Sequence, residues 1–211
     1  MTHAAGYVRY DDGQWVADVT AAVYGGDVDT RRTVSVGAFA GLALANTHAE
    51  GQALSASVAR RFQLEGDGVV ALGLMGTAST ASVDGFTEVG AGALSLQASG
   101  LERDWQSLNL SARFTQPYKV GSRLVRVYAG MGGLLTTGDR EATGDMRFTG
   151  APTGSGAFLV EGAETPPLAG VADFGLEVDA TSGVTLSAGY RGVFSDRLTD
   201  NQIGVKMNVR W

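Results

Sequence analysis

The chain has 211 residues, and 18% of them are charged. Its formal net charge is −6, and it contains no cysteine. This length suits one sizeable domain, the negative charge argues against nucleic acid as a partner, and the lack of cysteine fits an exported protein. The longest apolar run, residues 36–45, is about half of the ~20 residues that a membrane-spanning helix needs. A helical membrane protein is therefore excluded. A membrane barrel is not, because its strands show only alternation.

Alternating apolar and polar residues predict nine strands. In chain order we expect them at 6–10, 14–24, 54–62, 70–74, 107–114, 125–129, 172–179, 185–194 and 203–211. Tight turns are expected at 11–13, 65–68, 119–122 and 181–183, and long connections at 25–51, 77–104 and 138–167, with a moderate one at 195–202. The middle of the first long connection, 33–45, is apolar, and it either extends the strand beyond the membrane or folds back on it.

The last predicted strand has the strongest contrast between its two faces. One face carries Val205, Met207, Val209 and Trp211, and the other carries Lys206, Asn208 and Arg210. The chain stops on an aromatic residue inside this strand. Such an ending suits a barrel whose last strand must be recognised and paired, so we interpret the four apolar residues as a terminal assembly signal.

Two features predict the fold class. Short and long connections alternate, which places the tight turns at one end of an up-and-down sheet and the long loops at the other, as in outer-membrane barrels. The polar faces also carry full charges, which we expect to face a lumen: Arg113, Arg126, Asp173, Glu177, Asp179, Arg191, Lys206 and Arg210. We therefore predict an all-β, antiparallel, up-and-down outer-membrane β-barrel. The alternative is a soluble β-sandwich or β-solenoid.

Several motifs resemble the translocator domain of the classical autotransporters, the barrel of type V secretion, over nearly the whole chain. They are Tyr24-Gly25 followed by Asp29-Thr30-Arg31-Arg32; Val83-Asp84-Gly85-Phe86-Thr87-Glu88 followed by the glycine-alanine stretch 90–96; Gly189-Tyr190-Arg191-Gly192 with Thr199-Asp200-Asn201; and Val209-Arg210-Trp211. The order and spacing of these motifs together carry the resemblance.

The resemblance implies a twelve-stranded barrel in the bacterial outer membrane, which exports an attached passenger through its lumen. It also implies the barrel assembly machinery and periplasmic chaperones as partners, besides outer-membrane lipid and the passenger. The nine strands align with the fourth to twelfth of the family, so we expect residues 1–211 to be an incomplete domain whose sheet stays open. The first three strands, the linker helix and the passenger would be absent. An odd count also departs from the even-strand rule for bacterial barrels.

No motif of an enzyme or metal site is present, and we predict no catalytic, cofactor-binding or metal-binding residue. His3 and His48 lie in terminal or loop sequence without suitably spaced partners, and no nucleophile elbow, phosphate-binding loop or zinc motif occurs. Asp173, Glu177 and Asp179 share a strand face, where ion pairing with neighbouring cations is the better account than paired-carboxylate chemistry. A passive porin-like channel and an outer-membrane barrel enzyme remain as alternative functions.

Overall fold

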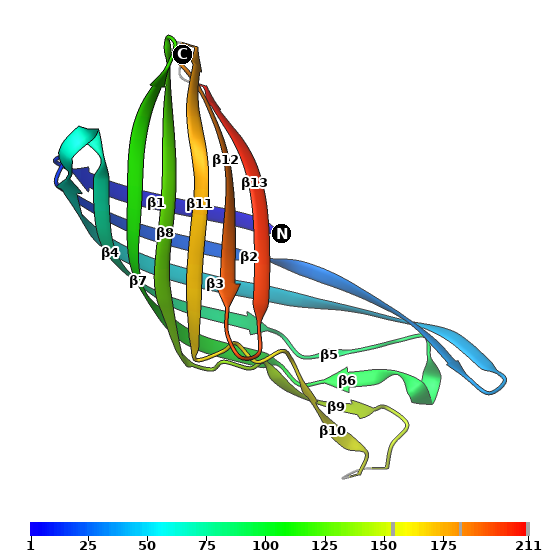
Figure 1. The fold of residues 1–211 in the computed structure, drawn as a ribbon. Helices are drawn as coiled ribbons and strands as arrows, with labels where there is room; N and C mark the ends of the chain where they lie inside the picture. Colours follow the sequence, from blue (N-terminus) through cyan, green and yellow to red (C-terminus); the bar gives the residue numbers. More distant parts are fainter. Residues whose placement is uncertain (153–154, 182, 210–211) are drawn as a thin grey trace.

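The computed structural model describes residues 1–152, 155–181 and 183–209. Its main element is a nine-stranded antiparallel sheet with the strand order β1-β2-β3-β4-β7-β8-β11-β12-β13 (Figure 1). The strands are β1 Thr2–Asp11, β2 Trp15–Val36, β3 Phe39–Gln63, β4 Val69–Val83, β7 Leu101–Val120, β8 Arg123–Gly138, β11 Leu168–Thr181, β12 Val184–Phe194 and β13 Thr199–Val209. Each strand pairs with its neighbour in the main sheet, so the up-and-down topology predicted from the sequence is confirmed.

The period-2 sequence pattern sets the register of the sheet. In β11, Phe174 lies between Ala129 of β8 and Tyr190 of β12, and its ring stacks on the Tyr190 ring at 5.0 Å between centroids. The next residue, Gly175, faces the opposite side, because successive side chains alternate across a strand. A shift by one residue would exchange the two faces of the whole strand, so the pattern fixes the pairing.

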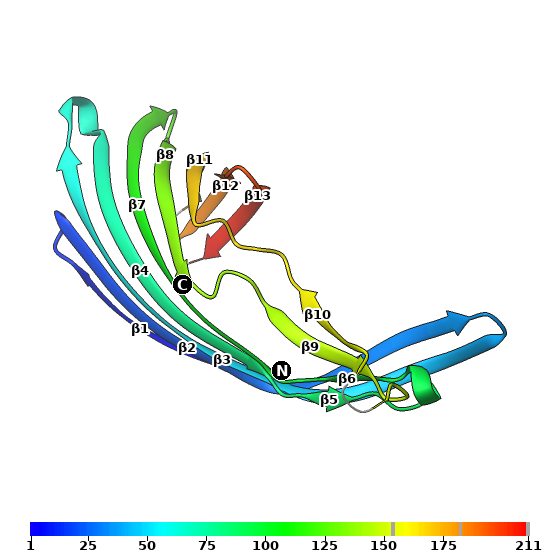
Figure 2. The same ribbon diagram turned by 90° about the horizontal axis from the view of Figure 1, so that it is seen from below.

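The sheet curls but does not close. Figures 1 and 2 show a curved half-barrel in which β1 and β13 form the two outer edges. Neither strand has a second partner within the described sheet. The open form predicted from the sequence is therefore the one observed.

Tight turns lie at one end of this sheet, where the sequence predicts them. Gly13, Gly66, Gly121 and Gly183 have φ values of 92°, 76°, 64° and 90°, in the left-handed region where glycine carries no steric cost. The turn between β3 and β4 includes the short 3-10 segment Glu65–Asp67. We call this end of the sheet the turn end, and the opposite end, which carries the long connections, the loop end.

The connection expected at 25–51 is not a loop. β2 has 22 residues and β3 has 25, and the two stay paired up to Val36 and Phe39, well past Gly25, which pairs with the first residue of β1. Of the two possibilities for its apolar middle, the strand extension is correct. Residues 33–36 include Thr33, Val34 and Val36, which favour extended backbone, and Gly37 with φ 57° makes the turn. We call residues 26–48 the outer hairpin.

The connection expected at 77–104 is shorter than predicted, the one expected at 138–167 covers 139–167, and both are partly ordered into a second sheet. β4 continues to Val83 and β7 begins at Leu101, so the first of these loops covers 84–100. The four strands of the second sheet are β5 Phe86–Thr87, β6 Leu96–Ala98, β9 Thr143–Phe148 and β10 Ala157–Glu161, in the order β10-β9-β6-β5. A 3-10 turn at Gly92–Leu94 joins β5 to β6. Sequence analysis missed these strands because segments of two to six residues carry too little periodicity.

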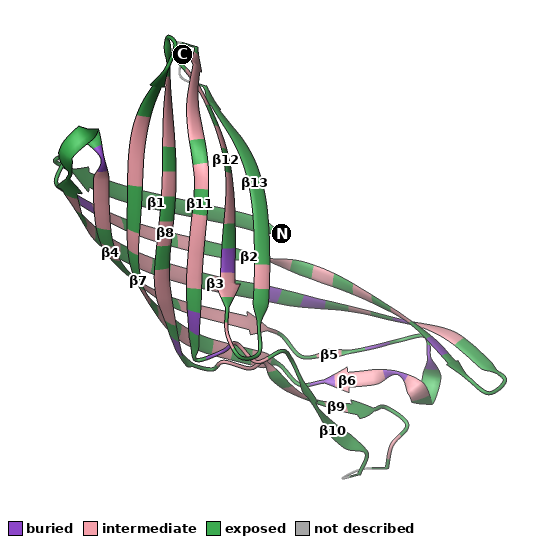
Figure 3. Cartoon of the chain, in the orientation of Figure 1, coloured by how far each residue is buried: buried purple, intermediate pink, exposed green. Residues whose placement is uncertain are grey.

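The apolar residues of the main sheet do not form a buried core. Figure 3 shows mostly exposed and intermediate residues along the nine strands. The described buried cluster of Val34, Ala43 and Ala91, with Leu94 packed against it, lies instead where the outer hairpin meets the 84–100 loop. Large apolar side chains on the sheet are open, with Leu110 64%, Met131 72% and Val205 82% exposed. Among the described residues, no helix has the length and hydropathy needed to cross a membrane.

Candidate functional site

One face of the sheet collects polar side chains from nearly every strand. The register places Arg61 opposite Ala71, Ala71 opposite Arg113, and Arg113 opposite Gly130, and the same row continues through Asp173, Arg191 and Gln202. Residues that are directly opposite each other share a face.

The other face carries the exposed apolar belt, which includes Leu54, Leu72, Leu110, Phe174 and Val205. We call the first the polar face and the second the apolar face.

A hollow of about 650 Å³ shows which way the polar face points. Its lining includes Ser57, Arg113, Asp173, Arg191 and Lys206, from β3, β7, β11, β12 and β13. Strands this far apart in the sheet can border one hollow only on the concave side of the curve. We therefore infer that the polar face is concave and the apolar face convex. That the concave side forms a hydrated lumen stays a prediction.

Five of the charged residues predicted to face a lumen form two groups of ion pairs. Arg113 donates to Asp173 at 2.5 Å and its guanidinium lies 4.7 Å from the centre of the Tyr128 ring. Gly130 lies between the two charged residues, and a Cβ there would approach the Asp173 carboxylate to 2.5 Å, so glycine leaves the space for this pair. Nearer the turn end, Arg126 pairs with Asp179 at 2.9 Å and with Glu177 at 3.9 Å.

The remaining predicted charges have different outcomes. Arg191 and Lys206 lie on the polar face and line the same hollow, but neither forms an ion pair with another described residue. They leave this part of the concave side with unneutralised positive charge. Arg210 lies outside the described residues, so its predicted orientation is not addressed by the structure.

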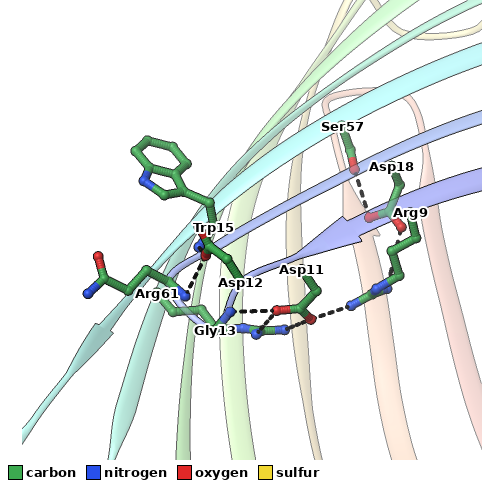
Figure 4. A network of polar contacts seen from close by, with 9 residues as sticks. Arg9, Asp11, Asp12, Gly13, Trp15, Asp18, Ser57 and Arg61 are labelled. Carbon is green, nitrogen blue, oxygen red and sulfur yellow. Dashed lines mark hydrogen bonds and ion pairs between the residues drawn. The ribbon is translucent and has the colours of Figure 1, made fainter.

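A third network at the turn end was missed by sequence analysis. Arg61 on β3 reaches across β2 to the Asp11 carboxylate on β1 with two hydrogen bonds of 2.8 and 3.1 Å (Figure 4). Asp18 accepts hydrogen bonds from Arg9 and Ser57 at 3.4 and 3.3 Å. The network links three strands on the polar face. The alternation of charged residues in β1 and β3 was its only signal in the sequence.

Two of the sequence motifs meet at the loop end. Arg32, from the Asp29-Thr30-Arg31-Arg32 motif, donates from Nε and Nη2 to the Glu88 carboxylate at 3.0 and 2.5 Å, and Glu88 ends the Val83–Glu88 motif. The Glu88 side chain is 6% exposed and also accepts a bond of 2.7 Å from the Leu96 backbone N–H. Arg32 lowers the pKa of the Glu88 carboxyl, and Glu88 in turn raises the pKa of Arg32. We call this pair with its backbone partners the outer latch.

Further contacts link the 84–100 loop to the other connections at the loop end. Strand β6 of the 84–100 loop pairs with β9 of the 139–167 loop, and Arg103 of β7 donates to the backbone oxygens of Asp139 and Arg140 at 2.6 and 2.9 Å. Glu164 pairs with Arg140 at 2.9 Å and also with Arg197 in the connection before β13. All four connections at the loop end are therefore linked through described contacts.

The terminal strand pairs along its described length with β12. Val205, Met207 and Val209 lie opposite Ala188, Leu186 and Val184, on the apolar face. Val205 and Met207, 82% and 65% exposed, are among the most exposed apolar residues of that face, because β13 is an edge strand. Trp211 lies outside the described residues. The role of these residues as an assembly signal stays a prediction.

Neither histidine belongs to a cluster of possible metal ligands among the described residues. His48 lies on the outer hairpin, where its Nδ1 is 3.0 Å from the Asp27 carboxylate, and this hydrogen bond raises the pKa of His48. His3 lies on β1 opposite Tyr24. Within the described residues, no group of three or more histidine, aspartate or glutamate side chains could hold a metal ion.

A curled antiparallel sheet with a charged concave face, an open apolar convex face and tight turns at one end has the construction of an outer-membrane β-barrel, here incompletely closed. The family model described as the autotransporter beta-domain matches residues 1–191, and the chain belongs to this family of outer-membrane translocator barrels. No curated protein matches the chain.

Proposed function

We propose that the chain anchors in the bacterial outer membrane and conducts an attached passenger outward along its polar face. The observation that carries this proposal is the separation of the two faces, with ion-paired polar residues inside the curve and an uncovered apolar belt outside it. An exported polypeptide in extended form needs water or polar groups for its backbone. The polar face supplies such groups from β1 to β13, whereas an apolar lining would hold the passenger back.

A closed barrel with antiparallel ladders throughout needs strands in addition to these nine. Its nine strands alternate in direction, so β1 and β13 run the same way. If these edges paired with each other, or with the opposite edges of a second copy in the same orientation, the new ladder would be parallel. An odd number of added strands joins them by antiparallel ladders throughout. We propose that residues 1–211 occupy the fourth to twelfth positions of the family barrel and that three more strands complete it.

The partners follow from the same proposal. Each unpaired backbone group of an edge strand costs several kcal/mol in lipid, so an open sheet needs help until its edges are joined. We propose that periplasmic chaperones and the barrel assembly machinery provide this help, and that the machinery recognises the terminal signal on β13. The passenger is expected to be covalently attached to the full-length protein.

Export can be tested with an epitope-tagged passenger placed ahead of the completed barrel. Protease added to intact cells should remove the tag, while the barrel stays protected in the outer membrane. A tag that survives on intact cells and is digested only after the outer membrane is opened would contradict passenger export. If that barrel also conducts ions in a planar bilayer, the passive channel becomes the better account.

A further inference from the structure

Arg60 is a cation on the apolar face. It lies on β3 between Val58 and Phe62, whose side chains point the same way, and it pairs across the ladders with Trp15 of β2 and Leu72 of β4. Arg60 is exposed, as are its three large neighbours Trp15, Phe62 and Leu72. The next residue, Arg61, points to the opposite face and pairs with Asp11. Two consecutive arginines thus stand on opposite sides of one strand.

Two aromatic rings lie close to the Arg60 guanidinium. It lies 5.4 Å from the centre of the Trp15 ring and 4.9 Å from that of the Phe62 ring, within the range of cation–π contacts. No carboxylate of the described residues lies within ion-pair distance of Arg60, unlike Arg61, Arg113 and Arg126. Aromatic faces stabilise the cation but do not accept from its N–H donors, and no described residue accepts a hydrogen bond from them. The guanidinium is therefore open to an anion from outside the chain.

The position of Arg60 at the turn end indicates which anion it would meet. β3 ends at Gln63, three residues beyond Arg60, or about 10 Å along the strand. The turn next to Trp15 is fixed by Asp12, which accepts hydrogen bonds from the Trp15 N–H at 2.6 Å and from the Tyr10 hydroxyl at 3.1 Å. Trp15 points away from the polar network beside it (Figure 4). Tyrosine and tryptophan rings of this kind mark the membrane–water boundary, where lipid phosphates lie.

We propose that Arg60, Trp15 and Phe62 form a binding site for the phosphate of an anionic phospholipid in the membrane leaflet at the turn end of the sheet. The guanidinium donates to the phosphate oxygens, for which its planar fork is suited. The two rings hold it against the sheet, and the acyl chains lie on the neighbouring apolar face. The site depends on the placement of the barrel in a membrane, and it does not depend on passenger export.

The test measures lipid selectivity with the full chain reconstituted in phosphatidylcholine vesicles. Spin-labelled phosphatidylglycerol and spin-labelled phosphatidylcholine report the relative association constants of an anionic and a zwitterionic phospholipid. One cation near the membrane surface contributes about a fivefold preference, which we expect for the wild type. Arg60→Gln should abolish most of this preference, and Arg60→Lys should keep part of it.

Arg61→Gln is the matched control, because it removes the same charge one residue away on the other face. It should weaken the link to Asp11 but keep the lipid preference. The proposal is overturned if the wild type shows no preference, if Arg60→Gln retains it, or if Arg61→Gln loses it equally. A site that took only free phosphate would show no lipid preference, because the readout is the association of a labelled lipid.

Discussion

Arg32 and Glu88 are the residues where sequence motifs and structure agree most directly. They are 56 positions apart, belong to two separately quoted motifs, and meet in one buried carboxylate site. Nothing in either motif alone indicates the other as its partner. Their contact gives a physical reason for both motifs: they attach the 84–100 loop to the outer hairpin.

Replacing Arg32 by Gln should loosen this loop without unfolding the sheet. The change leaves the Glu88 carboxylate buried without its cation, which costs about 1–3 kcal/mol of local stability, reduced because the Arg32 side chain is 36% exposed. Amide hydrogen exchange should quicken at Leu96, whose N–H donates to Glu88, and not in β11. Equal acceleration in both segments would show that the latch supports the whole sheet.

The same pair should make the loop acid-sensitive. The pKa of Glu88 is lowered in the folded state, so its stabilisation is present above the ordinary pKa of 4.5 and is lost as the pH falls through the lower folded value. Protease cleavage within 84–100 should therefore increase at acidic pH in the wild type. In Glu88→Gln cleavage should already be high at neutral pH and should change little with acid.

At the scale of the element, β11 shows how the two faces differ in what they tolerate. Phe174→Arg places a charge on the apolar face, near the middle of the strand, and should cost about 2–4 kcal/mol in lipid. Glu177→Gln removes a partly exposed charge whose contact with Arg126 is long, 3.9 Å, and should cost less than about 1 kcal/mol. Urea unfolding in lipid vesicles compares them. Similar losses for both variants would reject the assignment of the faces.

Gly175 on the same strand is a site of close packing on the polar face. The Tyr128 hydroxyl would approach a Cβ at Gly175 to 2.5 Å, and the Ala188 backbone oxygen also lies in the way. Gly175→Ala should therefore cost about 1–3 kcal/mol through displaced neighbours. Gly133→Ala is the control, because no atom lies within 4 Å of its added Cβ. A control variant as unstable as Gly175→Ala would show that crowding against Tyr128 and Ala188 is not the cause.

The sequence predicts the elements of the main sheet better than their ends. Alternation between residues 172 and 179 identifies β11 and its faces, because each side chain has only one of two environments. Alternation does not show that β2 and β3 continue as the outer hairpin. Beyond the membrane the two faces of a strand are no longer separated into one that meets lipid and one that meets water. Contacts such as Arg61 with Asp11 depend on the register of three strands and on side-chain reach, which a linear pattern does not contain.

For the whole molecule, the fold class could be predicted because it rests on many residues acting together. A soluble sheet of nine strands would have to cover its apolar face, and the described structure has only the small cluster at Val34, Ala43 and Ala91. Lipid is the solvent that stabilises such an exterior. The odd strand count favours an open sheet, whereas the linked loops at the loop end could not be predicted, because they depend on strands of two to six residues from separate loops.

The central claim is that the convex face contacts lipid while the concave face contacts water. Because the chain has no cysteine, single cysteines can be placed at each position from 172 to 179 without a background signal. In the membrane-embedded protein, a water-soluble maleimide should label positions 173, 175, 177 and 179 and spare 172, 174, 176 and 178. Uniform labelling of all eight positions, or labelling with the opposite alternation, would contradict the account.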